Sequence, residues 1–192
     1  MGNLDEILAF NREFVKNKEY EKYQTTKFPD KRLVVLSCMD TRLVELLPKA
    51  MNMRNGDIKH VKSAGAVVSH PFGSIMRSIM VAIYELNAEE VMVIGHYDCG
   101  MSAIDSKSVL NKMVDKGISP QTISTLEHAG VNLNKWLKGF SCVDESVKES
   151  VATIRNHPLL PPNIPVHGLL IDPETGKLDL VVNGYEEIKA SK

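Results

Sequence analysis

Residues 90–100 have the sequence EVMVIGHYDCG, in which a short apolar run leads directly into a histidine and a cysteine. The run Glu90–Gly95 shows no alternation of polar and apolar residues, which is typical of a parallel strand buried on both faces. A second run of this kind, Leu33–Ser37 (LVVLS), ends at Cys38. Side chains that come directly after parallel strands gather at one edge of the sheet, beyond the carboxyl ends. If the two strands are neighbours, we therefore expect Cys38, His96 and Cys99 to converge.

The rest of the chain alternates between helix-like and strand-like segments. We expect further strands over Lys59–Lys62, Pro165–Ile171 and, after a turn, Lys177–Val182. Apolar spacing and flanking Pro and Gly residues predict helices over residues 3–17, 41–52, 72–87, 101–116, 120–138 and 143–156. This alternation predicts an α/β fold, with about four parallel strands and one antiparallel edge strand flanked by helices.

Composition limits the class of protein. A chain of 192 residues with 43% hydrophobic and 24% charged residues is expected to form one ordinary globular domain. The net charge of −1 gives no electrostatic basis for binding nucleic acid or an anionic membrane. No apolar run approaches the roughly 20 residues of a spanning helix. The first residues, MGNLDEILAF, carry acidic groups where a signal peptide has basic ones, so we expect a cytoplasmic protein.

The cysteines indicate a metal site. Three cysteines in a reducing compartment favour metal binding, catalysis or burial over disulfides. His96 and Cys99 supply an imidazole and a thiolate from one short turn, and Cys38 supplies a distant third ligand. Zinc takes such ligands in tetrahedral geometry, and three protein ligands leave the open position that is typical of a catalytic site. We predict one Zn²⁺ per chain at Cys38, His96 and Cys99, with Cys142 outside the site.

Two motifs carry a family resemblance. The segment Cys38-Met39-Asp40-Thr41-Arg42, followed at a distance by His96-Tyr97-Asp98-Cys99-Gly100, resembles the hallmark of the β-class carbonic anhydrases, in their small bacterial and archaeal branch. The resemblance covers about residues 30–180 and extends to Ser63-Ala64-Gly65, Met80–Leu86 and His167-Gly168-Leu169. It implies a zinc-bound fold, a dimeric assembly and reversible hydration of carbon dioxide to bicarbonate, by attack of a zinc-bound hydroxide.

The resemblance also assigns roles to individual residues. It implies that Arg42 holds Asp40 in an ion pair and that Asp40 accepts the hydrogen bond of zinc-bound water. In some members the equivalent aspartate instead binds zinc in a closed state, so Asp40 is also an alternative metal ligand. The substrate pocket is expected at Gly65, Ala66 and Gly100. Many members have an asparagine where this chain has Ala66.

The chain is expected to divide into an arm and a domain. Residues 1–28 form a helical arm whose apolar stripe includes Leu4, Ile7 and Phe10, and a polar segment comes after it. Such a stripe on an arm predicts packing against a partner subunit, in a homodimer or a dimer of dimers. Residues 29–192 form the zinc-binding α/β domain.

Other interpretations remain open at this point. A hydrolase of carbonyl sulfide or carbon disulfide would use the same scaffold, and a zinc-binding regulatory protein would keep the metal without turnover. Asp40 and Arg42 alone would also suit a structural ion pair. His167 lies in an apolar run and is expected to be a core histidine. A nucleotide-binding fold is disfavoured because no glycine-rich loop comes after the first strand.

Overall fold

The computed structural model describes residues 2–190 and is built on a five-stranded sheet. Its strands are β1 (Leu33–Cys38), β2 (Ile58–Ser63), β3 (Glu90–His96), β4 (Val166–Ile171) and β5 (Leu178–Val182). The order across the sheet is β2-β1-β3-β4-β5. The first four strands are parallel, and β5 runs antiparallel to β4 at the edge. The predicted mainly parallel α/β fold is confirmed.

Helices surround this sheet and extend away from it. They are α1 (Asn3–Lys16), α2 (Leu43–Ala50), α3 (Ser74–Tyr84), α4 (Ser106–Asp115), α5 (Pro120–His128), α6 (Leu133–Trp136), α7 (Val143–Arg155) and α8 (Gly184–Ala190). Three short 3₁₀ turns connect elements: η1 (Glu21–Tyr23), η2 (Ala64–Ala66) and η3 (Gly100–Ala103).

The central strands β1, β3 and β4 are buried on both faces of the sheet. On one face, Leu36 of β1 joins an apolar cluster with Ile79 of α3 and Ile154 of α7. On the other face, Val35 of the same strand joins a second cluster with Leu43 of α2. Because both faces of β1 must be apolar, the strand appears in the sequence as an uninterrupted apolar run.

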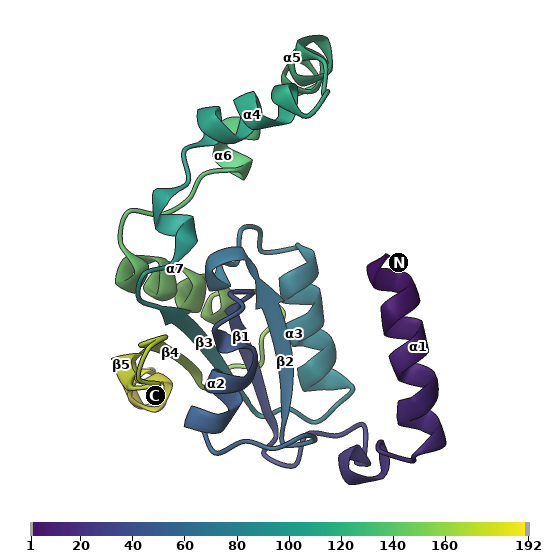
Figure 1. The fold of residues 1–192 in the computed structure, drawn as a ribbon. Helices are drawn as coiled ribbons and strands as arrows, with labels where there is room; N and C mark the ends of the chain where they lie inside the picture. The colour runs from purple at the N-terminus through teal and green to yellow at the C-terminus, as the bar shows by residue number, and fades with distance from the viewer. Residues whose placement is uncertain (1, 191–192) are drawn as a thin grey trace.

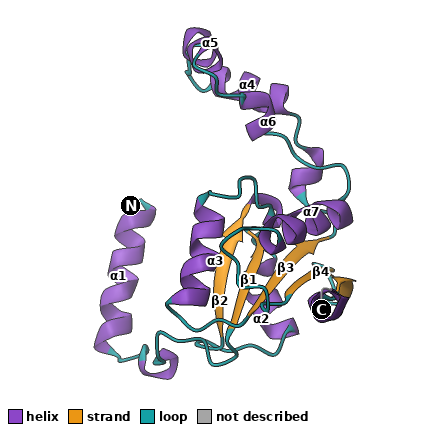
Figure 2. Cartoon of the chain, turned by 180° about the vertical axis from the view of Figure 1, so that it is seen from behind, coloured by secondary structure: helices purple, strands orange, loops and turns teal. Residues whose placement is uncertain are grey.

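The helices α4 to α6 form an excursion, residues 104–139, that projects beyond the carboxyl ends of the strands (Figures 1 and 2). The predicted single helix over 120–138 is wrong. Helix α5 ends at His128, the chain turns through Gly130 with a φ of +91°, and α6 is only one turn long. The helix predicted over 101–116 begins late, because Asp105 caps α4 by accepting the N–H of Ser108.

The N-terminal helix α1 stands apart from the sheet in both views (Figures 1 and 2). None of its residues is buried. The final helix α8 was not expected from the sequence, and it packs beside β4 through a hydrogen bond from the Gly184 N–H to His167 Nδ1. Across residues 2–190, no helix combines the length and the apolar character needed to cross a membrane.

Candidate metal centre

The three predicted ligands meet at the carboxyl ends of neighbouring strands. Cys38 is the last residue of β1, His96 is the last of β3, and Cys99 lies in the turn after β3. Because β1 pairs directly with β3, the two sequence fragments are brought together without a long loop. All three side chains are buried, and their ligand atoms lie within 4.8 Å of one another. The predicted convergence is confirmed.

The spacing of the two sulfurs suits a tetrahedral metal ion. The Sγ atoms of Cys38 and Cys99 are 3.9 Å apart. Two sulfurs bound to one zinc ion at about 2.3 Å and at the tetrahedral angle would lie about 3.8 Å apart. A disulfide would need about 2.05 Å. The observed separation therefore fits a shared zinc ion and does not fit a disulfide.

His96 is oriented for ligation. Its Nδ1 lies 2.8 Å from the carbonyl oxygen of Tyr97, and since a carbonyl only accepts, Nδ1 must carry the proton. The lone pair of the neutral ring is then on Nε2, which is buried and has no hydrogen-bond partner. A histidine that ligates a metal through one nitrogen commonly donates its other N–H to a backbone carbonyl in this way. The orphaned Nε2 is therefore placed to bind a metal ion.

The environment makes the two thiols unequal. Burial alone would raise the pKa of Cys38, but the facing ring of His96 and backbone N–H groups, of which Gly65 donates one over 3.3 Å, lower it to about 7. Burial raises the pKa of Cys99 to about 11, and the negative charge of the facing Cys38 adds to the rise. Cys38 is therefore the readier thiolate, and a metal must displace a proton from Cys99.

Asp40 lies at the rim of the cluster in an ion pair with Arg42. The Arg42 Nε donates to Asp40 Oδ1 over 3.0 Å, and Nη2 donates to Oδ2 over 2.9 Å. These side-chain hydrogen bonds lower the pKa of Asp40 to about 2. The same Oδ2 is 3.7 Å from His96 Nε2, so the carboxylate borders the position a metal would take.

Asp98 completes this arrangement, although no role in the site was assigned to it from the sequence. Arg42 Nη1 donates to its carboxylate, and Arg42 Nη2 donates to its backbone carbonyl, each over 2.9 Å. Asp98 has a φ of +51°, a conformation that aspartate tolerates better than most residues. Its place inside the His-x-x-Cys turn was the available signal, because that turn faces the segment holding Arg42.

The comparisons with known proteins agree with this geometry. The profile of the carbonic anhydrase family matches residues 33–178, from the start of β1 into β5. The chain belongs to the β-carbonic anhydrase family. The crystal structure of β-carbonic anhydrase isoform I from Trichomonas vaginalis superimposes with a TM-score of 0.88 and 35% identity, covering 96% of this chain and 100% of that one.

Sequence relatives of this β-carbonic anhydrase family member include two kinds of protein. The YtiB protein of Bacillus subtilis (strain 168), provisionally named a carbonic anhydrase, is 64% identical over 185 residues, which is 96% of this chain and 99% of that protein. A carbon disulfide hydrolase of Acidithiobacillus thiooxidans is 31% identical over 158 residues, covering 78% of this chain and 76% of that enzyme. The sequence relatives of this chain therefore include proteins named carbonic anhydrase and proteins named carbon disulfide hydrolase.

The three residues expected to form the substrate pocket lie in different surroundings in this carbonic anhydrase homologue. Gly65 is buried and donates its N–H to Cys38 Sγ. Ala66 is also buried and has a φ of +58°, a left-handed conformation that asparagine adopts more readily than alanine. Gly100 is exposed beside Cys99, with open space around its Cα. Two of the three expected pocket residues, Gly65 and Ala66, are therefore buried near the metal ligands, whereas Gly100 is exposed.

The remaining cysteine and the core histidine lie away from the ligands. Cys142 is an exposed free thiol at the start of α7, as expected for a residue outside the site. His167 is a buried histidine, as predicted, and its Nε2 lies 3.1 Å from a carboxylate oxygen of Glu90. No sequence pattern indicated the partner of His60, which is the hydroxyl of Ser37 at 2.7 Å.

Proposed function

We propose that this protein catalyses the reversible hydration of carbon dioxide to bicarbonate on one zinc ion held by Cys38, His96 and Cys99. The observation that carries the proposal is the convergence of these three buried ligand atoms beside an ion-paired carboxylate. Zinc bound by three protein ligands acidifies a water in its open position and so supplies a nucleophile near neutral pH.

The chain's own residues would position and polarise the reactants. Asp40 is ionised at neutral pH because Arg42 holds its pKa at about 2. An ionised carboxylate at this distance from the ligands accepts a hydrogen bond and fixes the direction of the attacking lone pair. Arg42 supplies the fork of donors that would hold Asp40 away from a bound metal ion, which is the open arrangement that we propose. Asp98 fixes that fork from its other side.

A second substrate class, carbon disulfide or carbonyl sulfide, is supported by one observation. Relatives named carbon disulfide hydrolase match 78% of this chain at up to 31% identity. These molecules are linear electrophiles like carbon dioxide, so the same ligand set and carboxylate would serve. We favour carbon dioxide because relatives and folds of higher similarity carry the carbonic anhydrase name.

The pH dependence of carbon dioxide hydration tests the proposal. For zinc-loaded protein, stopped-flow kcat/KM is expected to rise with pH and level off with a single ionisation near ~7 or somewhat above, that of the metal's water. Asp40 adds no second step, because a carboxyl whose pKa is lowered to about 2 is ionised at every pH above about 4 and loses its charge only as pH falls toward 2.

Three results would contradict parts of this account. Zinc-loaded protein that hydrates no carbon dioxide but hydrolyses carbon disulfide would transfer the proposal to the second substrate class. A kcat/KM for carbon dioxide hydration that rises with pH more steeply than one ionisation allows would indicate the closed state, in which Asp40 binds the metal of the resting protein. Protein that binds zinc and turns over neither substrate would favour a regulatory role.

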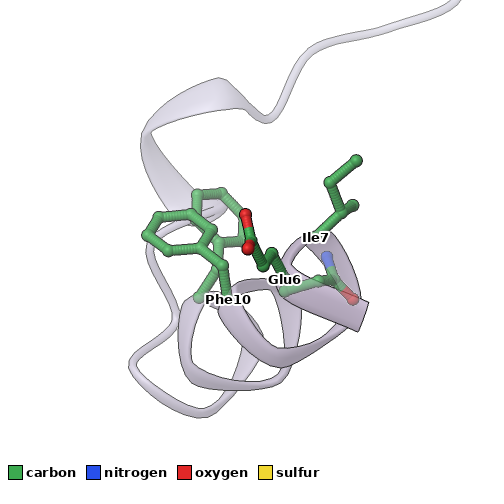
Figure 3. Close-up of a pocket in the computed structure, with 5 residues that line it drawn as sticks. Glu6, Ile7 and Phe10 are labelled. Atoms are coloured by element: carbon green, nitrogen blue, oxygen red, sulfur yellow. The ribbon is translucent and has the colours of Figure 1, made fainter. Parts of the chain in front are cut away.

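The helix α1 is the surface that we propose to pack on a second copy of the chain. Its residues Leu4, Ile7 and Phe10 are each more than 60% exposed. Ile7, Phe10 and Phe14 line an open hollow together with Glu6 and Asn11 (Figure 3). Since none of the α1 residues is buried within the described part of the chain, a homodimer would bury this apolar stripe. All three cysteines are free thiols, which suits the reducing cytoplasm that we propose as the compartment.

Reversing the polarity of this stripe should separate the subunits. For Ile7→Asp we expect the dimer dissociation constant to rise about 100-fold or more, because a buried isoleucine contributes about 1.5–3 kcal/mol in each of two copies. Ala9→Asp is the matched control, since it introduces the same residue on the opposite face of α1. Light scattering at micromolar concentration measures the change. The proposed dimer contact would be wrong if the wild-type protein were a monomer, or if Ile7→Asp and Ala9→Asp had equal dimer dissociation constants.

A further inference from the structure

The excursion of residues 104–139 leaves and rejoins the domain beside the metal centre. Met101 lies in η3, just before the excursion, and Phe140 lies just after it. Gly139 packs against the backbone of Met101 so closely that a Cβ at Gly139 would overlap the Met101 carbonyl oxygen. This contact holds the two ends of the excursion together and places the side chains of Met101 and Phe140 next to each other.

Both side chains lie against Gly65. A Cβ on Gly65 would be 2.8 Å from Cε1 of Phe140 and 3.0 Å from Cγ of Met101, so no larger residue fits between them and the strand. Gly65 is the residue whose N–H donates to the Cys38 thiol. Met101 and Phe140 are half-buried and pack on the apolar cluster that includes Cys38 and Cys99. They therefore belong to the apolar surroundings of the two sulfur ligands, next to the residue that donates to Cys38.

The metal centre thus has two chemically different sides. One side carries the charged groups Asp40 and Arg42, which bind water well. The other carries a thioether and a phenyl ring, which offer no strong hydrogen bond. A linear molecule without a dipole gains little on the charged side but can displace weakly held water on the apolar side. Substrate is therefore expected to approach the metal on the apolar side, where Met101 and Phe140 lie.

We propose that Met101 and Phe140 form an apolar cover whose size determines which linear molecule reaches the metal, and so sets the preference between carbon dioxide and carbon disulfide. This inference rests on the proposed function, because it assigns substrate selection to the same site. Sulfur is larger than oxygen, so carbon disulfide is wider and longer than carbon dioxide. A tightly packed cover resists the larger molecule, because closely packed side chains leave no spare volume.

The cover is tested first without any catalysis, on metal-free protein. Cys142→Ser serves as the background, since it removes the exposed thiol and leaves Cys38 and Cys99 as the only reactive sulfurs. A bulky aromatic disulfide reagent should then react with these thiols several times faster in Phe140→Ala and in Met101→Ala than in the background protein. Trp136→Ala is the matched control, because Trp136 is a 67% exposed aromatic residue of the same excursion. Its thiol reactivity should be unchanged.

The second test is selectivity in zinc-loaded protein. The ratio of kcat/KM for carbon disulfide to that for carbon dioxide should rise about tenfold or more in Phe140→Ala, the change that a small difference in pocket volume commonly produces. Phe140→Leu keeps an apolar side chain and should give a smaller rise. It also provides a folded variant if Phe140→Ala is unstable, with circular dichroism as the check. Trp136→Ala should leave the ratio at its wild-type value.

The two readouts distinguish the failure of the inference from the failure of the proposed function. Unchanged thiol reactivity in both cover variants would overturn the cover. An unchanged substrate ratio in protein that hydrates carbon dioxide would overturn its role in selection. Wild-type protein that binds zinc and turns over neither substrate would rule out the proposed function and, with it, the role of the cover in substrate selection. Even then, a faster thiol reaction in Phe140→Ala and Met101→Ala would support the presence of the apolar cover.

Discussion

Replacement of Cys38 by serine is expected to weaken zinc binding by more than the roughly 10–100-fold typical of losing a residue that only supports a ligand. Serine keeps the size of the side chain but removes the soft thiolate that zinc prefers. It also leaves two ligands, too few to hold the ion against water. We expect zinc content after dialysis to fall close to zero and carbon dioxide hydration to fall with it.

The third cysteine supplies the control for this experiment. Cys142→Ser changes the same atom in the same chain, at an exposed position at the start of α7. It should keep one zinc per chain and full activity, and serine also suits the N-cap position that Cys142 occupies before α7. Zinc is measured by plasma mass spectrometry. Cys38→Ser protein that retains one zinc per chain would remove Cys38 from the ligand set.

Replacement of Asp40 by alanine is expected to separate metal binding from catalysis. The carboxylate borders the ligands but is held by Arg42, so its loss should leave one zinc per chain. Turnover should fall by about 100-fold or more, the usual contribution of a positioned group that handles a proton. Steady-state hydration assays and metal analysis on the same sample measure both effects.

Asp98→Asn is the matched comparison for this variant. Asp98 also contacts Arg42, but its side chain is 86% exposed, and exposed ion pairs contribute little. The backbone carbonyl of Asp98 still accepts from Arg42 after the change, so turnover should fall about fivefold or less. Equal losses in the two variants would mean that the carboxylates act only by holding Arg42. Full activity in Asp40→Ala would remove Asp40 from the reaction.

Much of the fold and the metal ligands could be predicted because the controlling signals are local. An uninterrupted apolar run such as Leu33–Ser37 allows few interpretations, since only a strand buried on both faces needs it. Parallel strands place the residues at their carboxyl ends along one edge of the sheet, so the positions of Cys38 and His96 at strand ends were enough to predict their convergence. The ion pair of Asp40 and Arg42 was expected from the resemblance to the β-class carbonic anhydrases, whose hallmark segment contains both residues, and the structure forms it.

The parts that were missed depend on contacts between distant segments. The helix expected over 120–138 has suitable apolar spacing throughout, but Gly130 takes a positive φ that no periodicity reveals. Phe140 is far from Gly65 in the sequence, and their contact is accompanied by the close packing of Gly139 against Met101, which also joins distant segments. The role of Asp98 depends likewise on how one turn faces another.

The most direct test of the central claim is a zinc titration of metal-free protein, with the stopped-flow rate of carbon dioxide hydration measured at each point. The account predicts that the rate rises in proportion to added zinc and stops rising at one zinc per chain, while Cys38→Ser protein shows no rise. Protein that takes up one zinc per chain and hydrates carbon dioxide no faster than buffer would contradict it.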